Sequence, residues 1–195
     1  LFRYNPGCAL ALSRRGRRPL VNYSDPELLR IQAEVLYVHD ERGRLLRINE
    51  ADADEPAPRF FLARSRAGNI WRVRFDVPDD LVAELEHLAA AEPIADDLRK
   101  PPRYADQYGQ LLARQSPLAD VYSGPAYWLP ELEPPTGTVT ITRENRSLLA
   151  ANFPYTLSTL NERLPVVAVV DDGAAVAACF SARATASGCE AGVYT

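Results

Sequence analysis

The chain has 195 residues, of which 47% are hydrophobic and 25% are charged, as expected of a globular protein with its own hydrophobic core. A net charge of −4 does not favour nucleic-acid binding, which needs a positively charged surface. Three widely spaced cysteines predict neither a disulfide framework nor a cysteine zinc site. No apolar run approaches the ~20 residues that span a bilayer, and no signal-peptide pattern is found. We therefore expect a cytoplasmic protein that binds no membrane, no nucleic acid and no metal.

The first predicted elements are a short helix and a β-hairpin. Ser24 is a favourable N-cap residue and Pro26 suits the first helical turn, so we predict a helix over residues 25–32. The stretch 34–49 then alternates apolar and polar residues around Gly43, which is typical of a hairpin.

A second hairpin is predicted over residues 59–77, with Gly68 and Asn69 at its turn. Side chains two residues apart on a strand share a face, so each arm should present an apolar stripe, most simply explained as core. The residues predicted to share a face are Phe61, Ala63 and Ser65 on the first arm, and Trp71, Val73 and Phe75 on the second.

Two helices follow the hairpins. The stretch 78–93 has leucines at helical spacing, Asp79 or Asp80 as its N-cap, and Pro93 to end it. The stretch 103–115 places a set of apolar residues on one face, namely Tyr104, Tyr108, Leu111 and Leu112. Hairpins and helices together predict an α+β unit.

Residues 116–137 are rich in proline, which excludes a long helix and marks a connector between domains. A domain boundary therefore falls inside this stretch. We predict two domains, residues 1–125 and residues 126–195.

The second domain has the clearer pattern. A strand over 138–143 precedes a helical segment over 144–164, which Pro154 must break because proline clashes with the preceding turn. We expect two helices that meet near residues 152–154. Three adjacent antiparallel strands should follow, with an Asp-Asp-Gly turn between the first two. Their predicted bounds are 166–170, 175–183 and 189–194.

This order of strand, two helices and three strands, with VVAVVDDGAAVAACFSARAT followed by CEAGVYT, resembles the first half of the GNAT acetyltransferase fold. The preceding part, including IQAEVLYVHDERGRLLRINE and VYSGPAYWLP, is similar to the extra N-terminal domain of a bacterial subgroup of that family. The resemblance implies an α+β protein. In it, an N-terminal hairpin-and-helix domain precedes a mixed, mostly antiparallel sheet with flanking helices.

The resemblance also implies an activity, the transfer of an acetyl group from acetyl-CoA to an amine on a small molecule or a peptide. In this family the fourth strand lies beside the pantetheine arm of acetyl-CoA, and one of its N–H groups polarises the thioester carbonyl. Val193, Tyr194 and Thr195 are therefore the expected cofactor contacts. Glu190, the carboxylate on the same strand, is the expected general base for the amine.

The family's pyrophosphate-binding motif, Gln/Arg-x-x-Gly-x-Gly/Ala, has no counterpart in this sequence, which contains no Gly-x-Gly. We expect the sequence to stop before that motif, so that half of the active site is missing. The motif normally presents a helix N-terminus to the pyrophosphate, so residues 1–195 alone should bind acetyl-CoA more weakly than ~100 μM.

Other interpretations of the same residues stay open. One alternative is a non-catalytic binding or scaffolding module that retains part of the fold. Another makes Cys189 a thiol nucleophile, although neither His39 nor His87 lies in a motif that would supply its base. Without the resemblance, Tyr194 is more simply explained as a core residue than as a cofactor neighbour.

Overall fold

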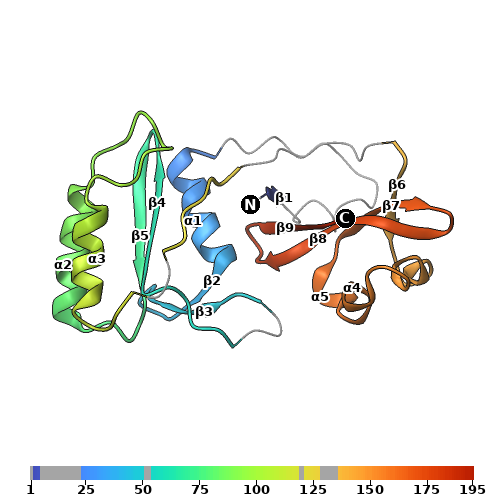
Figure 1. Cartoon of the computed structure of the whole chain (residues 1–195), viewed down its shortest axis with the longest axis horizontal. Helices are drawn as coiled ribbons and strands as arrows, with labels where there is room; N and C mark the ends of the chain where they lie inside the picture. The colour runs from blue at the N-terminus through green and yellow to red at the C-terminus, as the bar shows by residue number, and fades with distance from the viewer. Residues whose placement is uncertain (1, 5–22, 51–53, 119–120, 128–135) are drawn as a thin grey trace. The chain divides into compact units, whose positions relative to one another are not determined.

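The computed structural model describes residues 2–4, 23–50, 54–118, 121–127 and 136–195 (Figure 1). None of the helices in these ranges is long and apolar enough to cross a membrane. One of the three cysteines, Cys8, lies outside the described ranges, and so do residues 119–120 and 128–135 of the predicted connector.

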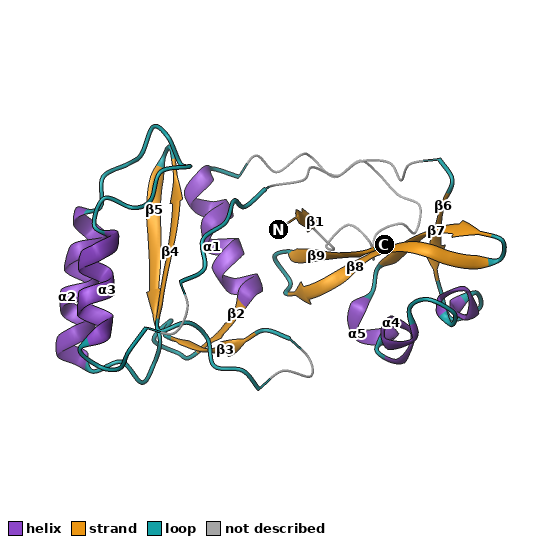
Figure 2. Ribbon diagram, viewed as in Figure 1, coloured by secondary structure: helices purple, strands orange, loops and turns teal. Residues whose placement is uncertain are grey.

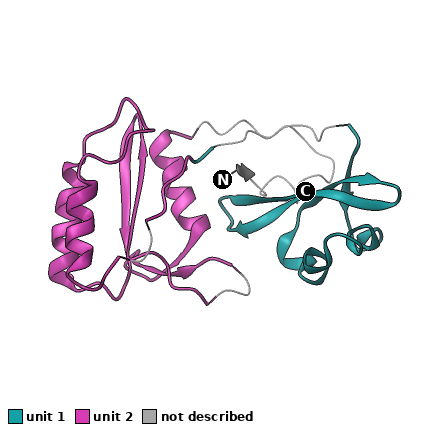
Figure 3. Ribbon diagram, viewed as in Figure 1, with its two compact units in different colours: residues 1–18, 126–195 teal, residues 19–125 magenta. Residues whose placement is uncertain are grey.

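Two compact units make up the chain (Figure 3). Residues 19–125 form one of them, here named the hairpin unit, and residues 1–18 together with 126–195 form the other, named the sheet unit. Strand β1 (Phe2–Tyr4) is grouped with the sheet unit because it pairs with the last strand of that unit. The chain is therefore an α+β protein in which each unit has its own antiparallel strands.

The hairpin unit contains two β-hairpins and three helices. One hairpin is β2–β3 and the other is β4–β5, both antiparallel. In chain order its elements are α1 (Asp25–Leu36), β2 (Tyr37–His39), β3 (Leu45–Ile48), β4 (Phe60–Ser65), β5 (Gly68–Val73), α2 (Asp79–Ala91) and α3 (Ala105–Ala113).

Hairpin β4–β5 separates two layers of helix, with α1 on one side and α2 with α3 on the other (Figure 2). Ala63 and Ile70 pack with Leu29 and Ala33 of α1. Val73, with Trp71 beside it, packs against α2 and α3. The alternation of the two arms thus buries both faces of the hairpin, as a two-residue period requires.

The structure corrects the predicted turn of this second hairpin. Ser65 pairs directly with Gly68, so the loop consists of Arg66 and Ala67, not Gly68 and Asn69. The Ser65 hydroxyl donates to the Gly68 carbonyl oxygen and accepts from the Ala67 N–H, which closes the loop two residues earlier than predicted. The predicted stripe also ends early, because Phe75 lies beyond β5 and is 55% exposed.

The three helices differ from prediction only at their ends. Helix α1 continues to Leu36, because Ala33, Val35 and Leu36 are buried and tertiary packing extends it. Helix α2 has Pro78 as its N-cap in place of the predicted aspartate.

Helix α3 begins beside a buried carboxylate. Glu92 accepts hydrogen bonds from the N–H groups of Arg103 and Tyr104 and from the hydroxyl of Tyr108. These donors satisfy a carboxylate that is only 5% exposed. Burial, and next the negative charge of Glu92, raise the pKa of Tyr108, so this phenol stays protonated and keeps its hydrogen bond across the neutral range.

The sheet unit is a five-stranded antiparallel sheet with helices on one face (Figure 2). The strands lie in the order β1, β9, β8, β7, β6. Besides β1, the elements are β6 (Thr138–Ile141), the 3-10 helix η2 (Arg146–Leu149), α4 (Pro154–Ser158), α5 (Leu160–Arg163), β7 (Val166–Asp171), β8 (Ala174–Ala184) and β9 (Cys189–Tyr194).

The three predicted C-terminal strands are confirmed as adjacent antiparallel neighbours. The predicted break at Pro154 is also confirmed, since this residue starts α4 and Phe153 before it, with φ −130° and ψ 53°, is not helical. The helical segment before the break is shorter than predicted, a single 3-10 turn. Asn152, at the junction, donates from its side-chain amide to the carbonyl oxygen of Ala175.

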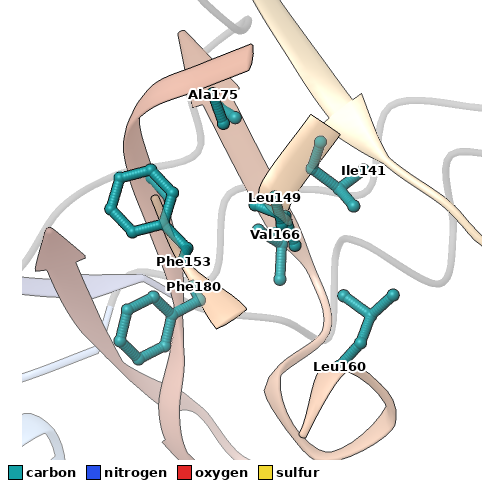
Figure 4. Packing of buried hydrophobic residues seen from close by; sticks show 9 residues of the cluster. Ile141, Leu149, Phe153, Leu160, Val166, Ala175 and Phe180 are labelled. Carbon is teal, nitrogen blue, oxygen red and sulfur yellow. The ribbon is translucent and has the colours of Figure 1, made fainter. Parts of the chain in front are cut away.

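The core of the sheet unit lies between the sheet and these short helices (Figure 4). Leu149 and Val166 are fully buried at its centre. The remaining members of the cluster are Ile141, Phe153, Leu160, Ala168, Ala175, Ala178 and Phe180.

The turn between β7 and β8 gives a first testable prediction. Asp172 and Gly173 have φ values of 44° and 74°, the signature of a type I′ turn, in which a side chain other than Asn or Asp is disfavoured. Gly173→Ala should lower the free energy of unfolding by about 1–2 kcal/mol because alanine is strained in the left-handed region. Asp172→Asn is the matched control and should be neutral or stabilising. Urea denaturation measures both, and an unchanged midpoint for Gly173→Ala would contradict the expectation.

Candidate functional site

The outer half of β9 is the part of the sheet that the sequence singled out. Strand β8 pairs with β9 along its whole length, from Cys189 to Tyr194. Strand β1 pairs on the other side, but only with Cys189 to Ala191. Within the described residues, no strand therefore lies beside the outer edge of Gly192, Val193 and Tyr194. An exposed strand edge of this kind can hydrogen-bond an extended chain as another strand would.

Glu190 lies in an unexpected environment for a general base. Its side chain is 5% exposed, and its Oε2 lies 2.6 Å from Nη1 of Arg183 on β8. The two residues are direct neighbours because a bulge at Ala182 shifts the register of β8 between Ser181 and Arg183. A base must reach the proton that it removes, whereas this carboxylate is buried and holds a guanidinium. The geometry is that of a buried ion pair linking β8 and β9.

Gly192 is required by the ring of Phe180. The two residues are directly opposite each other on β9 and β8, and a Cβ at position 192 would lie 2.6 Å from both Cε2 and Cζ of that ring. The Phe180 ring therefore lies over the glycine, on the helix-covered face of the sheet. It is 4% exposed, so it has little freedom to move away.

The three predicted cofactor contacts all lie at the end of β9, and each is exposed. Tyr194 is 44% exposed and contacts Phe180, with ring centroids 4.9 Å apart, and Phe153, at 6.3 Å. Val193 is 54% exposed and shares the opposite face with Cys179, its cross-strand neighbour. Thr195 follows the strand and is also exposed. Tyr194 thus has one side on the core and another facing solvent.

Arg163, the last residue of α5, lies on the same group of aromatic rings. Its guanidinium carbon is 4.7 Å from the centre of the Phe180 ring and 4.9 Å from that of Tyr155. Nε of Arg163 donates to Oγ1 of Thr159, which in turn donates to the carbonyl oxygen of Tyr155. Two rings and one hydrogen bond therefore hold the guanidinium in place.

The remaining chemistry near this edge is limited. Burial raises the pKa of the Cys179 thiol, so little of it is thiolate at neutral pH, and Cys189 is buried. His39 lies on β2 and His87 on α2, both in the hairpin unit. In the described ranges no group of three or more His, Cys, Asp or Glu residues is arranged to hold a metal ion.

The sequence pointed to β9 but missed the residues around it. Gly192 carried a signal, because a glycine inside a strand often marks a close approach. Arg163 carried none, since the rings that hold it come from β8 and α4, and only the packing of the helices onto the sheet brings them together. Comparisons of this chain with protein-family models, with curated proteins and with solved structures gave no match.

Proposed function

We propose that this chain contributes the acetyl-CoA edge of an acyltransferase, which moves an acetyl group from acetyl-CoA to an amine. The observation that carries the proposal is the end of β9, where Val193 and Tyr194 are exposed and no described strand pairs with the outer edge of Gly192 to Tyr194. In support, the strands and helices from β6 to β9 follow the order that the GNAT resemblance implies, with the helices on one face.

The residues of this edge suit an extended, amide-containing arm such as pantetheine. Alternate N–H and C=O groups of a strand point to each of its edges, so the segment 192–194 offers backbone donors and acceptors without involving side chains. Acetyl-CoA supplies a thioester, whose C–S bond breaks as the new C–N bond forms. A backbone N–H aimed at the carbonyl oxygen stabilises the charge that develops there, by about 2.7–4 kcal/mol for one well-placed donor.

The amine must lose a proton during the transfer, and Glu190 remains the predicted acceptor of that proton. Its ion pair with Arg183 favours a second role, which is to hold β9 in place beside β8. The substitution Glu190→Gln distinguishes the role of general base from the role of positioning residue. If Glu190 is the general base, this variant should react about 10²–10⁴-fold more slowly and lose the fall in rate at low pH that protonation of the carboxylate causes. If Glu190 is a positioning residue, the variant should chiefly lose stability.

Titration with acetyl-CoA, followed by the backbone amide signals in NMR spectra, tests the proposal directly. The amides of Gly192, Val193 and Tyr194 should shift as acetyl-CoA is added up to millimolar concentration. Strand β6 is the internal control, because it is the other edge of the same sheet and its amides should not shift. Equal shifts at both edges, or none at β9, would contradict the proposal. Binding without acetyl transfer to any amine would favour a non-catalytic module.

A further inference from the structure

Arg163 differs from the other half-buried arginines in the part of the chain that the structure describes. Each of the others donates from a terminal nitrogen to a protein carbonyl or carboxylate oxygen. Arg163 uses only Nε, which is bonded to Thr159. Among the described residues no oxygen accepts from its two terminal nitrogens, and no carboxylate lies within ion-pair distance. A positioned guanidinium with both terminal nitrogens available is suited to bidentate binding of an anion.

The surroundings of Arg163 favour a small anionic ligand. The two rings that contact the guanidinium differ in exposure, since Phe180 is buried and Tyr155 is 51% exposed. The guanidinium therefore contacts one ring that belongs to the core and one ring at the surface. The terminal N–H groups of a guanidinium donate in its own plane, so contacts with ring faces do not use up these donors.

The position of this guanidinium connects it to the end of β9. The Phe180 ring contacts both Arg163, at 4.7 Å, and Tyr194, at 4.9 Å. A single side chain, Phe180, therefore separates the guanidinium of Arg163 from Tyr194, at the strand end where the acetyl group would be presented. An anion bound at Arg163 would belong to a molecule within reach of that strand end.

We infer that Arg163 binds the carboxylate of the amine acceptor, so that the acceptor class is an amino acid or another small amine carrying a carboxylate. This inference rests on the proposed acetyl transfer. Planar anions with two oxygens match the two terminal nitrogens of the guanidinium, which can bind both oxygens at once. Arg163 then acts as a specificity residue that orients the acceptor, while its charge takes no part in the chemistry.

The first test measures binding without any acetyl transfer. N-acetyl-leucine and N-acetyl-leucinamide differ only in the carboxylate, and the first is the product expected from an α-amino acid. The unmodified chain should bind the carboxylate about 10- to 100-fold more tightly than the carboxamide, because hydrogen bonds to charged groups are the stronger ones. The Nε–H signal of Arg163 should shift with N-acetyl-leucine alone. Equal affinity for the two probes would overturn the inference.

Variants at position 163 complete the test. Arg163→Met should bring the two affinities together, and Arg163→Lys should restore part of the difference because it retains the charge but not the planar fork. Arg146→Gln, at an exposed arginine of η2, is the matched control and should behave like the unmodified chain. Thermal melts verify that each variant is folded. If Arg163→Met keeps the preference for the carboxylate, another group binds it and the inference fails.

Acetyl transfer distinguishes this inference from the proposed function. With leucine and leucinamide as acceptors, transfer that favours leucine in the unmodified chain but not in Arg163→Met supports both. Equal transfer to the two acceptors overturns the role of Arg163 and leaves the acyltransferase proposal standing. A preference for N-acetyl-leucine in binding, without transfer to any amine, supports the anion site and counts against the acyltransferase.

Discussion

Arg183→Met is expected to lower the free energy of unfolding of the sheet unit by about 3–5 kcal/mol, the cost typical of breaking a buried ion pair from one side. The Glu190 side chain is 5% exposed, so water cannot readily replace the guanidinium that lies 2.6 Å from it. Replacing both partners, as Arg183→Met with Glu190→Met, should recover much of this loss because neither charge of the pair is then left without the other. The pair would then add little net stability compared with two apolar side chains, although breaking it from one side is costly.

Amide hydrogen exchange along β8 and β9 measures this effect within the sheet unit, independently of the hairpin unit. Arg143→Met is a suitable control because Arg143 is exposed on the same unit. A loss below about 1 kcal/mol for Arg183→Met would mean that the pair behaves like an exposed one. The same conclusion would follow if the double variant were no more stable than Arg183→Met alone.

Gly192→Ala is expected to destabilise the sheet unit by about 1–3 kcal/mol, the range for overpacking in a core. The new Cβ would meet two atoms of the Phe180 ring at 2.6 Å, so the ring must move. Phe180 also supports Arg163 and contacts Tyr194, so its displacement disturbs both residues of the candidate site.

A second substitution tests whether the Phe180 ring causes the loss of stability in Gly192→Ala. Phe180→Leu shortens the side chain that meets the new Cβ, so Gly192→Ala should cost less in the Phe180→Leu background than in the unmodified chain. Urea denaturation of the four proteins in this double-mutant cycle gives the coupling energy. Strictly additive effects would show that Phe180 is not the residue that requires glycine at position 192.

Local physical chemistry made several parts of the fold predictable from the sequence. An Asp-Gly turn between apolar runs specifies a tight hairpin because few residues adopt positive φ, and the structure has that turn at Asp172 and Gly173. Pro154 breaks the helical segment because it lacks an N–H and clashes with the preceding turn. Leucines at helical spacing specified α2, whose Leu81 and Leu85 are buried.

Only the tertiary structure decided the details that depend on distant neighbours. The hydroxyl of Ser65 closed the β4–β5 turn at Arg66 and Ala67, and packing lengthened α1 to Leu36. These outcomes depend on competing contacts that differ little in local propensity, so the sequence pattern could not rank them.

For the candidate site, the sequence by itself determined that residues 189–194 form a strand beside residues 175–183. It did not determine what the side chains of that strand meet. A one-residue bulge in β8 set Arg183 opposite Glu190. The carboxylate that the sequence predicted as a general base is therefore part of a buried ion pair. The packing of α4 and α5 onto the sheet brought Arg163 into contact with the rings of Tyr155 and Phe180. The two-residue period of a strand fixes which of its side chains share a face. Strand register and helix packing decide which groups those side chains contact, and both depend on the free energy of the whole unit.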